Sequence, residues 1–132
     1  MKYILDTNIC IYIIKKKPAT VLNNLRKINF DDICISSITL SELEYGVNKS
    51  SDPGRNKLAL IEFLVQIKIL PFDEIAASEY GKIRASLESA GKPIGSMDML
   101  IAAHALSQNL ILVTNNRREY NRIKDLKIIN WA

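Results

Sequence analysis

The chain has 132 residues, of which 48% are hydrophobic, so it is long enough to bury one core and too apolar to be disordered. Its formal net charge of +4 is compatible with a polyanionic partner, but a mildly basic balance is also common in cytoplasmic proteins. No apolar run approaches the roughly 20 residues that cross a membrane, and no signal-peptide pattern precedes Asp6.

Cysteine usage points to a reducing compartment. Cys10 and Cys34 both lie in apolar runs, without the spacing of a metal site, which favours buried free thiols in the cytoplasm. We therefore expect a single cytoplasmic domain over residues 1–132 with no membrane association.

Short apolar runs typical of buried strands recur along the chain. In order they are Tyr3–Leu5, Ile33–Ser36, Ile67–Leu70, Leu110–Thr114 and Lys127–Ile129. Helical patterns fall between them at Ile9–Ile14, Ala19–Ile28, Ile38–Asn48, Arg55–Gln66, Ile75–Ala90, Met97–Ser107 and Arg118–Ile123. Alternating strands and helices predict an α/β fold with a mostly parallel sheet and helices on both faces.

Four acidic residues come just after a predicted strand or in the first turns of a helix. They are Asp6, Glu42, Asp98 and Glu119. These positions share one edge of a parallel sheet, where the acids would repel one another unless a divalent cation were bound. Oxygen ligands suit Mg²⁺ or Mn²⁺, and no His/Cys cluster suggests zinc. The matching chemistry is metal-assisted phosphodiester hydrolysis.

Each acid also has a purely structural interpretation. Asp6 could be the N-cap of the next helix, and Asp98 could simply favour a helix N-terminus. Glu42 and Glu119 could be solvated surface residues, although Leu40 and Leu43 flank Glu42. The joint pattern of all four acids favours the metal site.

Four segments of the chain form a recognisable set. They are Leu5-Asp6-Thr7-Asn8, the Ser37 to Gly46 stretch, the Gly95 to Ala105 stretch, and Leu112 to Asn116 followed by Glu119-Tyr120. Together these segments resemble a PIN-domain ribonuclease, specifically a VapC-type toxin of a bacterial toxin–antitoxin pair. The resemblance covers essentially the whole chain. It implies a three-layer α/β/α sandwich and a Mg²⁺- or Mn²⁺-dependent endoribonuclease.

The resemblance also implies site residues. Asp6, Glu42 and Asp98 would be the principal acids, with the metal at Asp6 and Asp98 and with Asn8 beside them. Thr7 and Thr114 would position Asp6 or a bound water. The family often carries an aspartate in the last motif, where this chain has Asn116 and Glu119, so the fourth position stays open between a direct ligand, action through water and no part in the site.

The implied partners are an RNA substrate and a protein. The resemblance is closest to toxins that cut structured RNA at one site, with initiator tRNA as a notable target. It implies a homodimer neutralised by a small VapB-type antitoxin, which binds operator DNA and inserts a segment into the toxin groove.

Basic residues flank the acids in sequence, at Lys15-Lys16-Lys17 and Arg117-Arg118, and could hold RNA phosphates or simply be solvated. His104, the only histidine, is expected to be structural because it has no partner triad. Trp131 is expected to pack rather than to stack on a base.

Three other functions compete with the nuclease toxin. A phosphatase using Asp6 as nucleophile is disfavoured, because enzymes of the haloacid-dehalogenase type usually carry a second aspartate where this chain has Asn8. A non-catalytic scaffold and a DNA-directed nuclease of the same fold remain open at this stage.

Overall fold

A parallel sheet forms the centre of the molecule. The computed structural model describes residues 2–132, in which the strands are β1 (Tyr3–Leu5), β2 (Ile33–Ser36), β3 (Lys68–Leu70), β4 (Ile111–Val113) and β5 (Ile128–Ile129). They lie in the order β3-β2-β1-β4-β5, and every neighbouring pair is parallel. The α/β prediction and the parallel sheet are confirmed.

The strand order reverses beside the central strand. From β1 the chain builds outward through β2 and β3, and then crosses back to add β4 and β5 on the other side. The carboxyl ends of β1 and β4 therefore border the topological switch point, where α/β sheets usually bind ligands. Asp6 directly follows β1, and Thr114 directly follows β4.

The helices occupy the segments between the strands. Their bounds are α1 (Thr7–Lys15), α2 (Ala19–Arg26), α3 (Ser37–Lys49), α4 (Pro53–Leu64), α5 (Glu74–Ser89), α6 (Ser96–Ser107) and α7 (Arg117–Tyr120). One further turn of 3-10 helix, Phe30–Asp32, was not predicted. Side-chain caps begin several helices: Ser36 accepts from the Ile38 N–H at 3.1 Å, and Asp73 accepts from the Ala76 N–H at 3.0 Å.

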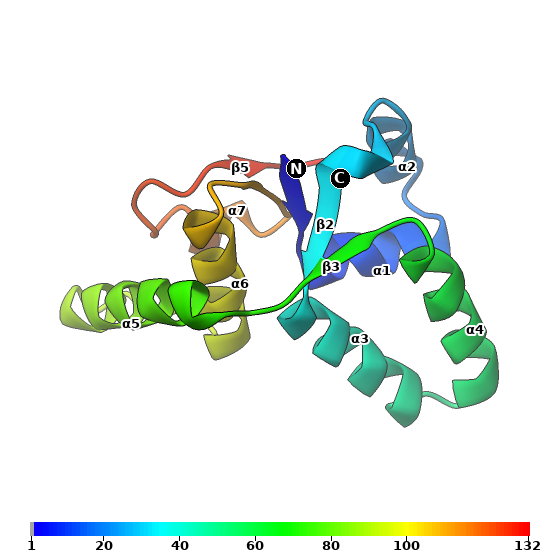
Figure 1. Ribbon diagram of the computed structural model, residues 1–132, viewed down its shortest axis with the longest axis horizontal. Coiled ribbons are helices and arrows are strands. Elements are labelled where there is room, and N and C mark those ends of the chain that lie inside the picture. Colours follow the sequence, from blue (N-terminus) through cyan, green and yellow to red (C-terminus); the bar gives the residue numbers. More distant parts are fainter. Residues whose placement is uncertain (1) are drawn as a thin grey trace.

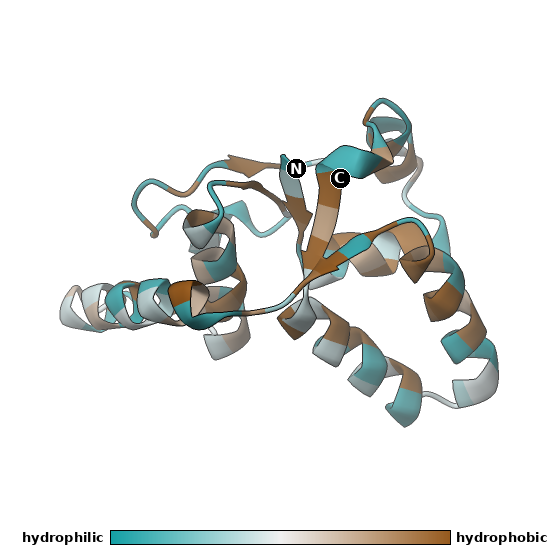
Figure 2. Cartoon of the chain, viewed as in Figure 1, coloured by the Kyte–Doolittle hydropathy of each residue, from teal (hydrophilic) through white to brown (hydrophobic). Residues whose placement is uncertain are grey.

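The two faces of the sheet are covered by different helices, which makes the three-layer sandwich (Figure 1). Ile4, Cys34 and Leu112 point into a core shared with α5 and α6. Leu5 and Val113 point into the opposite core, shared with α1 to α4. The alternation follows from the two-residue period of a strand, and apolar residues are concentrated on the strands and on the inner sides of the helices (Figure 2).

Several smaller expectations are also confirmed. Cys10 and Cys34 are buried free thiols. Trp131 is buried and packs against Tyr3, with ring centroids 5.7 Å apart. Within residues 2–132, none of the helices has the length and apolar character needed to cross a bilayer.

Candidate active site

Asp6 occupies the end of β1 and has both of its carboxylate oxygens engaged. Oδ1 accepts a hydrogen bond from the Ile9 N–H at 2.9 Å and so caps α1, while Oδ2 accepts from the hydroxyl of Thr114 at the end of β4. The capping interpretation and the site interpretation of Asp6 are therefore compatible. Thr114 lies where the sequence expectation placed it, beside Asp6.

The charge on Asp6 is held in an unfavourable place. The side chain is only 4% exposed, and burial raises its pKa from 3.8 to about 6. The negative charges of Asp98 and Glu42 add to the rise, against the two hydrogen bonds, which lower the pKa. A carboxylate that is both buried and surrounded by like charge would gain from a bound cation.

Glu42 lies in the second turn of α3 and is held by Thr7. The Thr7 hydroxyl donates to Glu42 Oε1 at 2.7 Å and lies 3.4 Å from the hydroxyl oxygen of the buried Thr39. The sequence predicted that Thr7 positions Asp6 or a bound water. In the structure its hydroxyl donates to Glu42, so its side chain points from the start of α1 toward α3, and a role at a bound water stays a prediction. Thr39 is a site neighbour that the sequence did not single out.

Asp98 lies in the first turn of α6 and is held by Tyr120. The Tyr120 hydroxyl donates to Asp98 Oδ1 at 3.1 Å. Burial raises the pKa of Asp98, and the hydrogen bond from Tyr120 lowers it. The hydrogen bond with the Glu119 carboxyl and the negative charges of Glu119 and Glu42 raise it further. Tyr120 was noted in sequence only as the neighbour of Glu119, and its polar hydroxyl within a buried segment is the signal that could have marked it.

The last motif supplies Asn116 and Glu119 from the start of α7. The side-chain amide of Asn116 donates to Glu119 Oε2 at 3.3 Å, and its backbone N–H donates to the Thr114 hydroxyl oxygen at 2.9 Å. Glu119 is near enough to raise the pKa of Asp98. Asn8, by contrast, is exposed on α1, and within residues 2–132 its side chain makes none of the hydrogen bonds that hold these acids.

A common pattern emerges for Asp6, Glu42, Asp98 and Glu119, which we call the acidic cluster. Each member accepts a hydrogen bond from a neutral side chain: a threonine, a threonine, a tyrosine and an asparagine, respectively. The ion pairs found in residues 2–132 join other residues and include no member of the cluster. The acids are thus oriented but not neutralised.

This donor set fits a hard divalent ion. The acids are near enough to raise one another's pKa. In the described residues, however, no three His, Cys, Asp or Glu side chains lie close enough together to surround a metal by themselves. Mg²⁺ is usually held by one or two carboxylates and keeps several waters, which leaves room for substrate phosphate oxygens. Uncompensated carboxylates with all-oxygen donors at a switch point match that preference.

Comparison with known proteins identifies the family. The PIN domain family matches residues 3–126. The chain belongs to the PIN-domain family, in its VapC group. It is 49% identical to the tRNA(fMet)-specific endonuclease VapC of Shigella flexneri over 100% of this chain and 99% of the relative. It is 46% identical to Ribonuclease VapC2 of a Haemophilus influenzae strain, again over 100% and 99% of the two chains.

Solved structures agree with this assignment. A DNA-bound VapBC complex from Salmonella typhimurium has a chain that superposes with a TM-score of 0.95 at 44% identity, covering 100% of this chain and 99% of that one. VapBC2 from Rickettsia felis, bound to a DNA fragment from its promoter, gives a TM-score of 0.93 at 44% identity, covering 100% of both chains. The three-layer sandwich is therefore that of a PIN domain.

His104 has a structural place in this PIN domain. It is fully buried on α6, its Nδ1 lies 2.7 Å from the Ser36 hydroxyl oxygen, and its ring meets Phe72 edge to face. Burial lowers its pKa, against the charge of Asp73, which raises it. The uncharged ring therefore links the end of β2 to α6, as the structural interpretation of this histidine predicts.

A groove opens beside the acidic cluster of the PIN domain, between α1, α3 and α4. Its volume is about 290 Å³, and Glu42 and Lys15 lie among its lining residues. The remaining walls are mostly apolar, with Ile11, Ile14, Leu43, Val47, Ala59 and Leu60 among them. A mostly apolar groove that contains the carboxylate of Glu42 is suited to a peptide with a basic side chain.

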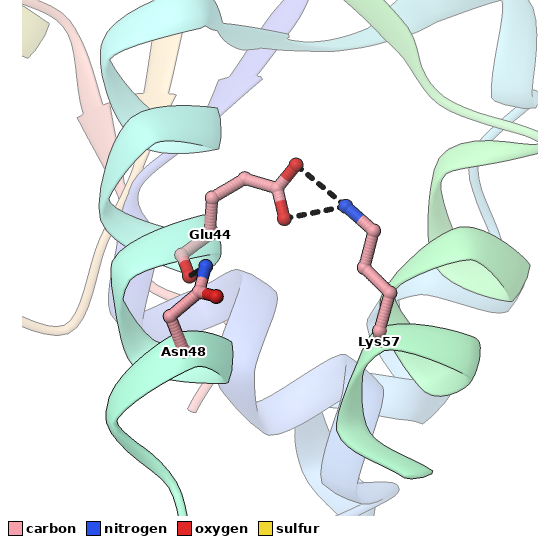
Figure 3. Close-up of polar contacts among 3 residues, drawn as sticks. All are labelled: Glu44, Asn48 and Lys57. Atoms are coloured by element: carbon pink, nitrogen blue, oxygen red, sulfur yellow. Dashed lines mark hydrogen bonds and ion pairs between the residues drawn. The ribbon is translucent and has the colours of Figure 1, made fainter. Parts of the chain in front are cut away.

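Two of the helices that border the groove, α3 and α4, are joined by an ion pair (Figure 3). The ammonium of Lys57 on α4 contacts both carboxylate oxygens of Glu44 on α3, at 2.6 and 2.7 Å. The Asn48 side-chain amide donates to the Glu44 carbonyl one turn away at 2.8 Å. Both charged side chains are more than a third exposed, so the pair contributes little stability, although it joins α3 and α4 beside the groove.

Proposed function

We propose that this single PIN domain is a Mg²⁺- or Mn²⁺-dependent endoribonuclease toxin. The observation that carries the proposal is the acidic cluster at the switch point, where each acid is oriented by a neutral donor and none is paired with a cation. The names of the relatives, ribonuclease and tRNA(fMet)-specific endonuclease, support the same activity.

The acids divide the work by position. Asp6 and Asp98 are the proposed metal ligands. Asp6 directly follows β1, Asp98 lies in the first turn of α6, and the negative charge of Asp98 raises the pKa of Asp6. Glu42 and Glu119 flank them. A bound divalent ion would supply a water activated for attack on phosphorus and would stabilise the oxygen that leaves. The threonine, tyrosine and asparagine donors keep the carboxylates oriented without reducing their charge.

RNA is the proposed substrate. Lys15, Lys16 and Lys17 are exposed at the end of α1, and Arg117 and Arg118 are exposed on α7, so cations lie near an edge that would otherwise repel phosphates. The names of relatives in Shigella flexneri and Salmonella typhimurium favour initiator tRNA as the target.

A VapB-type antitoxin is the proposed inhibitor. The VapBC structures of relatives support such a partner, with operator DNA contacted through the complex. The groove between α1, α3 and α4 would receive apolar side chains of the antitoxin, and an arginine could reach Glu42 and the metal-binding edge. Such a contact would keep RNA out of the site, and the positive charge of the arginine would take the place of the charge of the metal ion.

Cleavage assays test the activity directly. Purified protein is incubated with total RNA and with initiator tRNA in Mg²⁺, in Mn²⁺ and in EDTA, and new 5′ ends are mapped. Discrete cleavage of tRNA that needs the metal is expected, with Asp98→Asn as the inactive control. Cleavage of DNA in preference to RNA would favour the DNA-directed alternative, and no cleavage of either would favour a scaffold.

The inhibitor is tested in cells. Expression of the chain alone should arrest growth, and co-expression of the adjacent small gene should rescue it. An arginine in the tail of that partner should matter more than a lysine if the contact is bidentate. Normal growth with a folded, metal-binding protein would contradict the toxin proposal.

A further inference from the structure

Asp98 is held differently from the other acids of the cluster. The donors to Asp6 and Glu42 are threonines, Thr114 at the end of β4 and Thr7 at the start of α1. The donor to Asp98 is instead an aromatic residue, Tyr120, at the end of α7. Within residues 2–132, Tyr120 is the one side chain or backbone group that donates a hydrogen bond to the Asp98 carboxylate.

We propose that Tyr120 is a positioning residue of the active site, which orients the Asp98 carboxylate for metal binding. The last motif would then contribute to metal binding in two ways, by the hydroxyl of Tyr120, which orients Asp98, and by the carboxylate of Glu119. This inference rests on the proposed function, since it assigns Tyr120 a part in the same metal site.

The tyrosine ring is placed rigidly enough for this role. Tyr120 is only 1% exposed, and its ring belongs to the core formed with α5, α6 and the inner residues of β4. Its backbone is fixed on both sides, with its N–H donating to the Asn116 carbonyl at 3.4 Å and its carbonyl accepting from the Ile123 N–H at 3.1 Å. The hydroxyl is thus delivered to Asp98 Oδ1 by a side chain that cannot swing away.

The hydrogen bond leaves the other oxygen of Asp98 available. Oδ1 accepts from Tyr120, while Oδ2 faces Gly95 and would lie 3.5 Å from a Cβ added there. Gly95 therefore places no side chain against Oδ2, and the Glu119 carboxyl lies within hydrogen-bond reach of the Asp98 carboxyl. Tyr120 orients one oxygen of Asp98, and the second is the oxygen that would take a metal or a water held by the metal.

A neutral donor suits this place better than a basic one. A lysine or arginine that donated to Asp98 in place of Tyr120 would cancel the negative charge that attracts the metal, and would itself repel the metal ion. The tyrosine hydroxyl orients the carboxylate and keeps its full charge. Partners that orient a ligand in this way typically change metal affinity or activity 10- to 100-fold when they are removed.

The test removes the hydroxyl alone. Tyr120→Phe keeps the ring in the core, and Tyr80→Phe is the matched control, because Tyr80 packs against the same core while its hydroxyl accepts from Arg84 at 3.0 Å, outside the site. Mn²⁺ dissociation constants are measured by calorimetry in the absence of RNA, and the stability of each variant is measured separately by urea unfolding in EDTA.

Tyr120→Phe should bind Mn²⁺ about tenfold more weakly, and Tyr80→Phe should bind as the wild type does. Adding Tyr120→Phe to Asp98→Asn should cause no further loss, because the hydroxyl acts through Asp98. Cleavage by Tyr120→Phe should recover at high Mn²⁺ concentration. A purely structural role would lower stability in EDTA without changing the Mn²⁺ dissociation constant, and that result would overturn the proposal.

Wild-type protein gives a second test if the variant does not fold. With isotope-labelled tyrosine, the ring resonance of Tyr120 should shift as Mg²⁺ is added while that of Tyr80 stays in place, and an unmoved Tyr120 resonance at saturating Mg²⁺ would refute the inference. Wild-type protein that neither binds a divalent ion nor cleaves RNA would instead refute the proposed function, so the two failures are distinguishable.

Discussion

Replacing Asp6 with asparagine should stabilise the metal-free protein while it destroys activity. The carboxylate is buried among like charges, and its pKa is raised from 3.8 to about 6. Asparagine has nearly the same shape and no charge, and its side-chain oxygen can still cap α1 by accepting from Ile9. The substitution therefore removes the unfavourable charge with little change in packing.

The magnitude follows from the pKa. A rise from 3.8 to about 6 corresponds to about 3 kcal/mol of unfavourable free energy for the ionised form in the folded state. This net rise already includes the hydrogen bonds from Thr114 and Ile9, which lower the pKa, so no separate amount is subtracted for them. We expect Asp6→Asn to raise the free energy of unfolding by about 3 kcal/mol at pH 7.5 in EDTA.

The pH dependence has a definite sign. A raised pKa means that the folded protein holds the Asp6 proton more tightly than the unfolded chain does. The stability that the wild type gains from this protonated group is therefore fully present below pH 3.8. It is lost as the pH rises through about 6. The advantage of Asp6→Asn should therefore be absent near pH 3.8, grow up to about pH 6, and stay constant above it.

Urea unfolding in EDTA between pH 4 and pH 7.5 measures this difference. Asp52→Asn is the matched control, because Asp52 caps α4 by accepting from the Arg55 N–H at 3.2 Å and is exposed. It should show no gain. Equal stability of Asp6→Asn and wild type at pH 7.5, or a gain that does not change with pH, would refute the electrostatic argument.

Three further predictions concern the metal and the groove. Asp98→Asn and Glu42→Gln should each lower RNA cleavage by about two orders of magnitude or more, and Glu119→Gln should lower it less; wild-type rates in a folded Asp98→Asn would refute the site. Mg²⁺ at 100 times its dissociation constant should raise the free energy of unfolding of the wild type by about 2.7 kcal/mol but should stabilise Asp6→Asn much less, and an unchanged urea midpoint for the wild type would argue against the metal. Gly46 lines the groove, with nothing within 4 Å of an added Cβ, so Gly46→Met should fill part of the groove and weaken antitoxin binding about tenfold without loss of cleavage, whereas Gly46→Ala should bind normally.

The sheet and its helices were predictable because each element carries a local pattern. Ile33–Ser36 is a continuous buried strand in the structure, as its apolar run predicts. The edge strand β3 begins at Lys68 instead of Ile67, because the Ile67 N–H donates to the Leu64 carbonyl at the end of α4 and so belongs to the turn that follows this helix. The 3-10 turn at Phe30–Asp32 has no periodic signal and was missed.

The positions of the acids were also predictable, but their partners were not. Strand ends and helix starts can be inferred from the sequence, which places Asp6 and Asp98 at one edge. Which hydroxyl reaches which carboxylate depends on the packing of distant segments: Thr7 and Glu42 are 35 residues apart, and Tyr120 and Asp98 are 22 apart. No local pattern encodes such a contact, so neither the hydrogen bond from Thr7 to Glu42 nor the one from Tyr120 to Asp98 was predicted.

The pairing of β1 with β4 has a consequence for when the protein becomes active. Thr114 and Asp6 are 108 residues apart, and the donor to Asp98 comes later still in the chain. During synthesis the first strand leaves the ribosome early, and Ile9 can cap its carboxylate at once, but the Asp6 carboxylate lacks its hydrogen bond from Thr114 until β4 has followed. Contacts of such long sequence separation form late in folding. A nascent chain that has not yet reached Tyr120 should therefore be harmless to the cell that makes it, and the nuclease site should assemble only after α7 has been synthesised.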